Sequence, residues 1–216
     1  LLAGTPSVFL RTSGCNLRCQ FCDTPFASWQ PEGPSISVEQ ACADIFAYDC
    51  RHVVLTGGEP MMFPELVALT ERLRQAGKHI TIETAGTLWL PVHCDLMSIS
   101  PKLSNSTPSV SAKSPPAWVE RHEATRHAPE VIRRLTEQFA FQLKFVIATP
   151  DDVAEVLLYL EEFPELSRDR ILLMPEGVDQ QRLADIGTWL EPLCKDHGFR
   201  FCPRLQIEWF GATRQT

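Results

Sequence analysis

The chain of 216 residues carries a net charge of −7 and is 44% hydrophobic, which suffices for one domain with a sizeable core. The acidic balance argues against direct binding of a nucleic-acid backbone, because affinity for phosphate comes from clustered Lys and Arg. No apolar run reaches the roughly 20 residues that a membrane span requires and nothing resembles a signal peptide, so we expect a cytoplasmic protein without membrane contact.

Short apolar runs alternate with longer amphipathic segments along the chain. Six runs rich in Val, Ile, Leu and Phe predict buried strands, at residues 7–11, 52–56, 79–84, 95–100, 141–147 and 170–174. Four segments have the periodicity and terminal residues of helices, at residues 37–48, 64–77, 150–163 and 179–198. Strand followed by helix, repeated, predicts an α/β fold, with parallel strands in a partial (incomplete) TIM-like barrel and a reduced set of outer helices.

The connection 103–129 interrupts this alternation. It is rich in Ser and Pro, and we expect a long loop that replaces or shortens one helix, with a helix resuming near Pro129. Elsewhere, polar or Gly/Pro turns follow four of the strands, at residues 56–60, 83–87, 100–102 and 174–177. Because the carboxyl ends of parallel strands meet at one edge of the sheet, the sequence predicts a ligand site at that edge.

Three of the eight cysteines are clustered just after the first predicted strand. Cys15, Cys19 and Cys22 form a C-x₃-C-x₂-C run, which favours metal or redox chemistry in a reducing compartment. Three thiolates can hold an iron–sulfur cluster and leave one iron open to an exogenous ligand. Zinc prefers four ligands, and the distant fourth would have to be His52, Cys50 or Cys94. The remaining cysteines are interpreted as small buried hydrophobic residues: Cys42, Cys50, Cys94, Cys194 and Cys202.

The cysteine run, followed by the turn Gly57-Gly58-Glu59-Pro60 after the second strand, resembles the radical S-adenosylmethionine superfamily. In that superfamily three cysteines hold a 4Fe–4S cluster, and S-adenosylmethionine chelates the fourth iron. By the resemblance, the two glycines and Glu59 contact the methionyl end of the cofactor. By themselves, these residues also fit an ordinary turn into a helix with an acidic residue near its N-terminus.

Finer motifs are similar to the 7-carboxy-7-deazaguanine synthase family along most of the chain: RTSGCNLRCQFCDT, LTGGEP, ETAGT, SISPKLSNS, QLKFVI and LMPEG. The resemblance implies a single radical SAM domain over residues 1–216. It implies conversion of 6-carboxy-5,6,7,8-tetrahydropterin to 7-carboxy-7-deazaguanine with loss of ammonia, on the route to queuosine and other 7-deazapurines. It further implies a requirement for Mg²⁺, a homodimer, a flavodoxin- or ferredoxin-type electron donor, and abstraction of hydrogen from C6 of the pterin.

The same resemblance assigns the site residues. Cys15, Cys19 and Cys22 would bind the cluster, and the Thr24 hydroxyl would bind Mg²⁺. Substrate would contact Arg11, Thr56 and the chain end at Thr216, although Arg11 also fits a surface ion pair. The binding site for S-adenosylmethionine would be lined by Phe21, Cys22, Asp23, Gly57, Gly58, Glu59, Glu83, Ser100, Pro101, Lys102, Met174, Pro175, Glu176 and Gly177. No side chain is predicted to be a catalytic base.

The beginning of the chain departs from the family pattern. Family members carry a substrate-clamping segment resembling Gln-Gly-Glu-Gly before a stretch like Ala3–Phe9, and we expect this clamp to be missing from the chain. Two other functions stay open. A glycyl-radical activase shares the cysteine spacing but should lack Thr24 and the Ser100-Pro101-Lys102 run. A metal-binding structural module would use neither iron nor sulfide if its metal were zinc.

Overall fold

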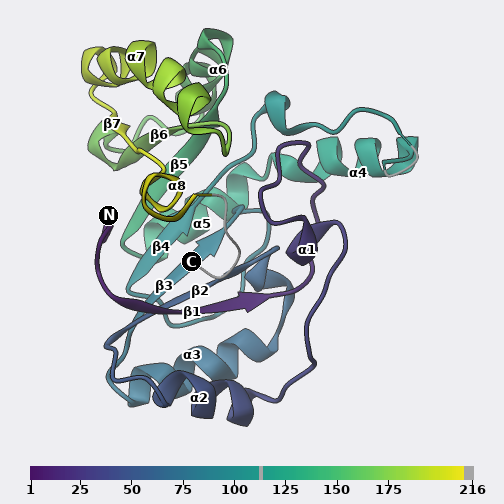
Figure 1. The fold of residues 1–216 in the computed structure, drawn as a ribbon, viewed down its shortest axis with the longest axis vertical. Coiled ribbons are helices and arrows are strands. Elements are labelled where there is room, and N and C mark those ends of the chain that lie inside the picture. Colours follow the sequence, from purple (N-terminus) through teal and green to yellow (C-terminus); the bar gives the residue numbers. More distant parts are fainter. Residues whose placement is uncertain (112–113, 212–216) are drawn as a thin grey trace.

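The computed structural model describes residues 1–111 and 114–211. Its framework is a parallel sheet of seven strands that lie side by side in chain order (Figure 1). The strands are β1 (Ser7–Thr12), β2 (His52–Gly57), β3 (His79–Thr84), β4 (Leu96–Ile99), β5 (Phe141–Ile147), β6 (Ile171–Pro175) and β7 (Arg200–Phe201). Within the described residues no pairing joins β7 to β1. The prediction of an incomplete barrel of parallel strands is therefore confirmed.

Helices connect the strands and cover the outer face of the sheet. The helices are α1 (Pro25–Ser28), α2 (Val38–Phe46), α3 (Glu65–Gln75), α4 (Pro116–Arg126), α5 (Pro129–Gln138), α6 (Pro150–Glu161), α7 (Gln180–His197) and α8 (Leu205–Phe210). Three short 3₁₀ turns add η1 (Pro60–Met62), η2 (Ser104–Ser106) and η3 (Arg168–Arg170). In Figure 1, α2 and α3 lie together at the bottom of the view, and α6 and α7 lie together at the top. None of the described helices is long and apolar enough to cross a membrane.

The four helices predicted from periodicity are present, with the expected ends. Ser37 Oγ accepts a hydrogen bond from the Gln40 main-chain N–H at 3.2 Å, which caps α2. Gly198 ends α7 in the left-handed conformation, with a φ of 72°. In that conformation a side chain would be strained, which explains why glycine stands there.

The connection 103–129 is not a loop throughout, so the prediction of a long loop was wrong for its central part. It contains η2 and α4, and α5 begins at Pro129 as expected. Helix α4 carries Pro116 at its first position, where the missing N–H has no helical partner to lose. It buries only His122 within its span, so it lacks the apolar periodicity by which helices are recognised. The short β7 and α8 are additions that the sequence pattern did not predict.

In the central strands β2 to β5, alternate residues belong to the packed core and the residues between them lie on the opposite face. Val53, Leu55, Ile82 and Phe145 belong to the core between sheet and helices, and each has no exposed surface. The opposite face carries a row of polar side chains across five neighbouring strands. This polar row consists of Arg11, Thr56, Glu83, Ser98 and Gln142. Its first four members lie one residue before the carboxyl ends of β1 to β4, and Gln142 is the second residue of β5. The sheet thus presents a polar inner surface to whatever binds there.

Candidate active site

The cysteine loop, residues 13–24, leaves β1 at the carboxyl edge of the sheet. Its fold is fixed by main-chain hydrogen bonds, from Gly14 N to Ala27 O at 2.8 Å and from Cys22 N to Cys19 O at 3.2 Å. The Trp29 indole N–H donates to Cys19 O at 3.1 Å. All three cysteines of the loop are free and partly exposed. The thiols are therefore available for a ligand rather than tied up in disulfides.

The surroundings of the thiols set their protonation. Burial raises the pKa of Cys15 and raises that of Cys19 to about 12, while the nearby Lys102 ammonium acts in the opposite direction on both. Lys102 Nζ is held by Ser100, at 2.5 Å from its carbonyl and 2.8 Å from its hydroxyl oxygen. Without metal the thiols of Cys15 and Cys19 are thus protonated, and metal binding must release their protons. Lys102 is the cation placed to favour thiolates.

The donor set fits an iron–sulfur cluster better than zinc. Soft thiolates select iron–sulfur clusters as well as zinc, but zinc in structural sites takes four protein ligands. Among the described residues, no three His, Cys, Asp or Glu side chains converge on a preformed metal site, so the thiols must turn inward when metal binds. Cys50 bonds to Pro6 O at 3.1 Å and His52 begins β2. They lie at the opposite edge of the sheet, roughly 20 Å away along a six-residue strand, which excludes a fourth ligand from there.

The glycines after β2 allow two loops to meet main chain to main chain. Gly58 N donates to Thr12 O at 3.1 Å, and Glu59 N donates to Gly14 O at 2.8 Å. A Cβ on Gly58 would lie 2.1 Å from Gly14 O, and Gly57 has a φ of 143° that side chains rarely adopt. Both positions therefore need glycine to seat the cysteine loop on the turn.

The Glu59 side chain has no exposed surface with which to contact a cofactor. Its carboxylate accepts hydrogen bonds from Thr84 Oγ1, from Ala85 N at 2.7 Å and from Met61 N at 3.0 Å. Burial raises the pKa of this carboxyl group, and the three donors oppose that shift. In this geometry the side chain ties the end of β2 to the end of β3, as the alternative interpretation of a structural turn required.

The other residues expected around S-adenosylmethionine follow the same edge of the sheet. Phe21 and Asp23 belong to the cysteine loop, Ser100 to Lys102 follow β4, and Met174 to Gly177 end β6. Pro101 and Pro175 are buried, and the Glu176 carboxylate pairs with Arg182 at 2.5 Å. The buried prolines and the paired Glu176 side chain are therefore occupied, and the main chain and the other side chains of these residues line the carboxyl edge of the sheet.

Arg204 joins two of these loops and was not identified from the sequence. This residue is 8% exposed, its Nη1 donates to Gly177 O at 2.8 Å, and its Nη2 pairs with the Asp23 carboxylate. It therefore brings together two predicted cofactor-binding residues from opposite ends of the chain. No local pattern signals such a role, because an isolated Arg before a short helix has many uses.

Thr24 precedes α1, at its N-cap position, with Oγ1 3.8 Å from Cys22 Sγ. Its hydroxyl thus lies beside one of the cluster cysteines. Thr216 lies outside the described residues.

The polar row begins at Arg11, four residues before the first cysteine of the cysteine loop. Thr56 Oγ1 donates to Glu83 Oε2 at 2.9 Å, and Lys144 Nζ lies 3.7 Å from Glu83 Oε1. Gln142 Nε2 donates to Ser98 Oγ at 2.9 Å. Arg11 is exposed and makes no ion pair among the described residues, which disfavours its interpretation as a surface salt bridge.

Ser98, Gln142 and Lys144 were missed in the sequence because they lie inside runs classified as apolar strands. The signal was present in the run FQLKFVI, where polar residues occupy alternate positions and so share one face.

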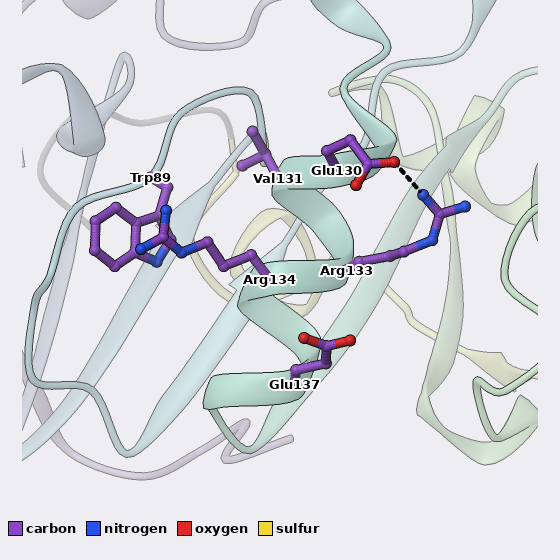
Figure 2. Close-up of a pocket in the computed structure, with 6 residues that line it drawn as sticks. All are labelled: Trp89, Glu130, Val131, Arg133, Arg134 and Glu137. Atoms are coloured by element: carbon purple, nitrogen blue, oxygen red, sulfur yellow. Dashed lines mark hydrogen bonds and ion pairs between the residues drawn. The ribbon is translucent and has the colours of Figure 1, made fainter.

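A separate surface hollow lies on the helical side of the sheet. It has a volume of about 410 Å³ and is lined by Trp89 and by residues of α5. Figure 2 shows the Arg134 guanidinium over the Trp89 ring, 3.2 Å from its centroid, and the Glu130–Arg133 ion pair at 2.6 Å. None of the residues expected to bind cluster, cofactor or substrate lines this hollow.

Comparisons with known proteins identify the family of the chain. The family model described as "Radical SAM superfamily" matches residues 9–140, which include the cysteine loop. The chain is 44% identical to 7-carboxy-7-deazaguanine synthase of Rhodopirellula baltica over 216 residues, covering all of this chain and 83% of the relative. It is 40% identical to 7-carboxy-7-deazaguanine synthase of Halobacterium salinarum, covering all of this chain and 87% of the relative.

The fold is similar to that of solved structures. The crystal structure of QueE from Escherichia coli gives a TM-score of 0.63 at 23% identity, covering 93% of this chain and 86% of that chain. The crystal structure of Streptococcus suis SuiB bound to S-adenosylmethionine gives a TM-score of 0.60 at 12% identity, covering 92% of this chain and 50% of that chain. At these identities the likeness concerns the fold alone.

Proposed function

Because the chain belongs to the radical SAM superfamily and, within it, to the 7-carboxy-7-deazaguanine synthase family, we propose that it converts 6-carboxy-5,6,7,8-tetrahydropterin to 7-carboxy-7-deazaguanine. The reaction contracts the pterin ring and releases ammonia, on the route to queuosine and other 7-deazapurines. Family membership argues against a zinc scaffold and against a glycyl-radical activase, the two alternatives left open by the residues alone.

Cys15, Cys19 and Cys22 would hold the 4Fe–4S cluster that superfamily members use with S-adenosylmethionine. When bound, these two cofactors supply a 5′-deoxyadenosyl radical by one-electron cleavage of a carbon–sulfur bond. The contribution of the chain is to place the thiols in one loop, with Lys102 beside them to favour the thiolate form. Arg204 would hold the two sides of the S-adenosylmethionine edge together through Asp23 and Gly177.

The position of the polar row carries the substrate assignment. Arg11 lies four residues before Cys15 on the inner face, and its register partner Thr56 is bonded to Glu83. A pterin with a carboxylate substituent needs cations for the carboxylate and acceptors for its ring N–H groups. Arg11 and Lys144 supply the first. Glu83, which the resemblance assigns to S-adenosylmethionine, lies beside Thr56 in the polar row, and we assign its carboxylate to the second role. The substrate bound there would lie next to the cluster loop and out of contact with the packed core.

Magnesium is the third cofactor of the proposal. Mg²⁺ keeps several waters and takes few protein ligands. The Thr24 hydroxyl and a carboxylate of the substrate therefore suffice to bind it. The half-buried Thr24 hydroxyl beside Cys22 supports this assignment. The metal would polarise the substrate as a Lewis acid.

The remaining partners follow from family resemblance. We include in the proposal a homodimer and a flavodoxin- or ferredoxin-type electron donor.

The proposal is tested by an anaerobic assay of the full-length protein after cluster reconstitution. The assay contains dithionite, S-adenosylmethionine, Mg²⁺ and 6-carboxytetrahydropterin, and the product is scored by mass. We expect 7-carboxy-7-deazaguanine to form in a Mg²⁺-dependent manner, with S-adenosylmethionine not consumed in proportion. If the cofactor is cleaved but no deazapurine forms, the superfamily assignment stands and the substrate assignment is wrong.

A further inference from the structure

Helix α4 buries a histidine where a helix normally buries apolar side chains. His122 has no exposed surface, and it is the only buried residue of α4. On the same face, Trp118 and Val119 stand four and three residues before it but are only half-buried, so apolar burial alone does not explain the packing of α4. The contacts of the imidazole ring therefore have to account for how α4 is seated.

Both ring nitrogens are hydrogen-bonded, and the bonds have a fixed direction. The main-chain N–H of Arg18 donates to His122 Nδ1 at 3.1 Å, so Nδ1 must be the acceptor. The proton then resides on Nε2, which donates to Ser106 Oγ at 2.9 Å. The Ser106 hydroxyl in turn donates to Leu103 O at 2.7 Å. This chain of bonds assigns the neutral imidazole with one tautomer, and burial lowers the pKa of His122 to about 4, which agrees with it.

The same buried unit holds the cysteine loop on both sides of Cys19. On one side, Arg18 N bonds to His122. On the other side, Gln20 N donates to Ser106 O at 2.9 Å, and Gln20 Nε2 donates to Asn105 O at 2.7 Å. Cys19 is thus the one cluster cysteine whose two neighbours are both bonded to the segment that carries η2 and α4.

The Arg18 side chain strengthens this attachment. Its Nη1 donates to Cys15 O and to Leu17 O, each at 2.7 Å. The guanidinium carbon lies 4.1 Å from the centroid of the Trp118 ring on α4, within the range of a cation–π contact. The arginine therefore braces the first half of the cysteine loop while its ring partner comes from the same helix as His122.

We propose that His122 is a positioning residue for the iron–sulfur cluster, which acts through the main chain of Arg18 and Gln20 to hold the Cys19 thiolate in place. The inference rests on the proposed function only in that Cys15, Cys19 and Cys22 bind a cluster. Residues one contact removed from metal ligands orient those ligands, and their loss commonly weakens metal binding by about 10- to 100-fold. Without the imidazole, Arg18 N loses its acceptor and Ser106 loses the donor that fixes its hydroxyl.

The test compares His122→Phe, His122→Gln and wild type after anaerobic reconstitution of the full-length protein. His122→Phe keeps an aromatic ring, somewhat larger than imidazole, without its hydrogen bonds, and His122→Gln keeps one donor and one acceptor. His127→Gln is the matched control, because His127 lies five residues further on with 39% of its side chain exposed. The readouts are iron per chain, the rate of iron loss to a chelator, and the cluster midpoint potential followed by electron paramagnetic resonance.

We expect His122→Phe to lose iron about tenfold faster than wild type and to shift the midpoint potential, with His122→Gln intermediate and His127→Gln unchanged. Wild-type iron loss and potential in His122→Phe would overturn the proposal. If His122→Phe does not fold, Ser106→Ala takes its place, with the same expectation and the same contradicting result. Iron uptake does not depend on the pterin, so an enzyme that loads its cluster but makes no deazapurine contradicts the substrate assignment alone. A wild type that takes up no iron overturns the cluster site and this inference with it.

Discussion

The Thr84 hydroxyl lies between both oxygens of the Glu59 carboxylate, at 2.8 Å from one and 2.9 Å from the other. This contact joins the ends of β2 and β3 directly beneath the turn that seats the cysteine loop. The Gly-Gly-Glu-Pro motif of this chain therefore has a structural role, because the glycines permit close packing and the glutamate locks the turn in place. A contact with S-adenosylmethionine at this turn would have to come from the main chain.

Replacing Glu59 should destabilise the protein whether or not any ligand is present. Glu59→Ala leaves the Thr84 hydroxyl and two main-chain N–H groups without an acceptor, and we expect a loss of about 3 kcal/mol in the free energy of unfolding. Urea unfolding of the apoprotein measures this loss of unfolding free energy. Thr188→Val is the control, because that exposed hydroxyl bonds only to Asp185 O. An apoprotein of wild-type stability that no longer binds S-adenosylmethionine would instead favour a direct contact.

Gly58→Ala should prevent the cysteine loop from closing on the turn. The added Cβ would lie 2.1 Å from Gly14 O and 2.5 Å from Ala27 O, both main-chain atoms that cannot move aside cheaply. We expect a loss of about 3 kcal/mol or more in unfolding free energy, together with poor iron uptake. Gly187→Ala is the control, because Gly187 lies within α7 and the added Cβ would have Phe201 Cζ, at 3.5 Å, as its nearest contact. That variant should be stabilised by about 0.5–1 kcal/mol. Equal behaviour of the two variants would contradict the packing described here.

The Cys19 thiol should react slowly in the folded apoprotein. Burial raises its pKa from the ordinary 9.0 to about 12, so the thiolate fraction at pH 8 falls about 1,000-fold. Alkylation by iodoacetamide under anaerobic conditions, with peptide mass analysis, should label Cys19 far more slowly in the native protein than in the same protein in urea. Equal labelling rates in the two states would show that this part of the cysteine loop is not closed in solution.

Stability should depend on pH through His122. Its pKa is lowered from 6.5 to about 4, mainly by burial and also by Arg126 and Lys102, with Glu123 opposing. Because the unfolded state binds the proton more readily, unfolding free energy should fall as the pH drops from 6.5 to 4, by about 3 kcal/mol.

Other groups titrate in this range, and the raised pKa of Glu59 acts with the opposite sign. The contribution of His122 is therefore the difference between wild type and His122→Gln, measured by urea unfolding at several pH values. The gap between the two should narrow as the pH falls. A gap that is constant from pH 7 to pH 4 would contradict a neutral, buried imidazole.

Lys144→Met should impair substrate use while leaving the cofactor chemistry in place. The Lys144 ammonium lies 3.7 Å from the Glu83 carboxylate on the inner face. Its loss removes the proposed contact to the substrate carboxylate, and a charged hydrogen bond of this kind contributes about 1.5–3 kcal/mol. We expect kcat/KM for the pterin to fall about 10- to 100-fold, with cleavage of S-adenosylmethionine in the absence of substrate unchanged. Lys195→Met, at an exposed position on α7, should behave like wild type. A Lys144→Met enzyme with unchanged kcat/KM would remove this residue from the substrate site.

The sheet could be predicted from the sequence because its strands are short apolar runs buried on at least one face. The position of the cysteine run after the first of them placed the cysteine loop at the carboxyl edge of the sheet, where the structure has it. The predicted bounds of β3 and β5 agree with the structure residue for residue. The strands and the position of the cysteine run depend on short stretches of sequence, so they can be recognised without knowledge of distant contacts.

The features that sequence could not supply depend on contacts between distant segments. Arg204 pairs with Asp23 across 181 positions of chain, and His122 reaches Arg18 across 104. The surroundings of Glu59 could not be foreseen, because a carboxylate in a turn gives no sign that three donors already surround it. Helix α4 was missed because a polar helix held by one buried imidazole lacks the apolar period that identifies helices.

The proposed function requires hydrogen transfer from C6 of a pterin bound at the polar row. The decisive measurement uses 6-carboxytetrahydropterin carrying deuterium at C6, with the reconstituted full-length protein and S-adenosylmethionine, analysed by mass spectrometry. We expect deuterium in 5′-deoxyadenosine or in recovered S-adenosylmethionine, together with 7-carboxy-7-deazaguanine as product. Formation of the deazapurine with no deuterium in either adenosyl compound would contradict hydrogen transfer from C6.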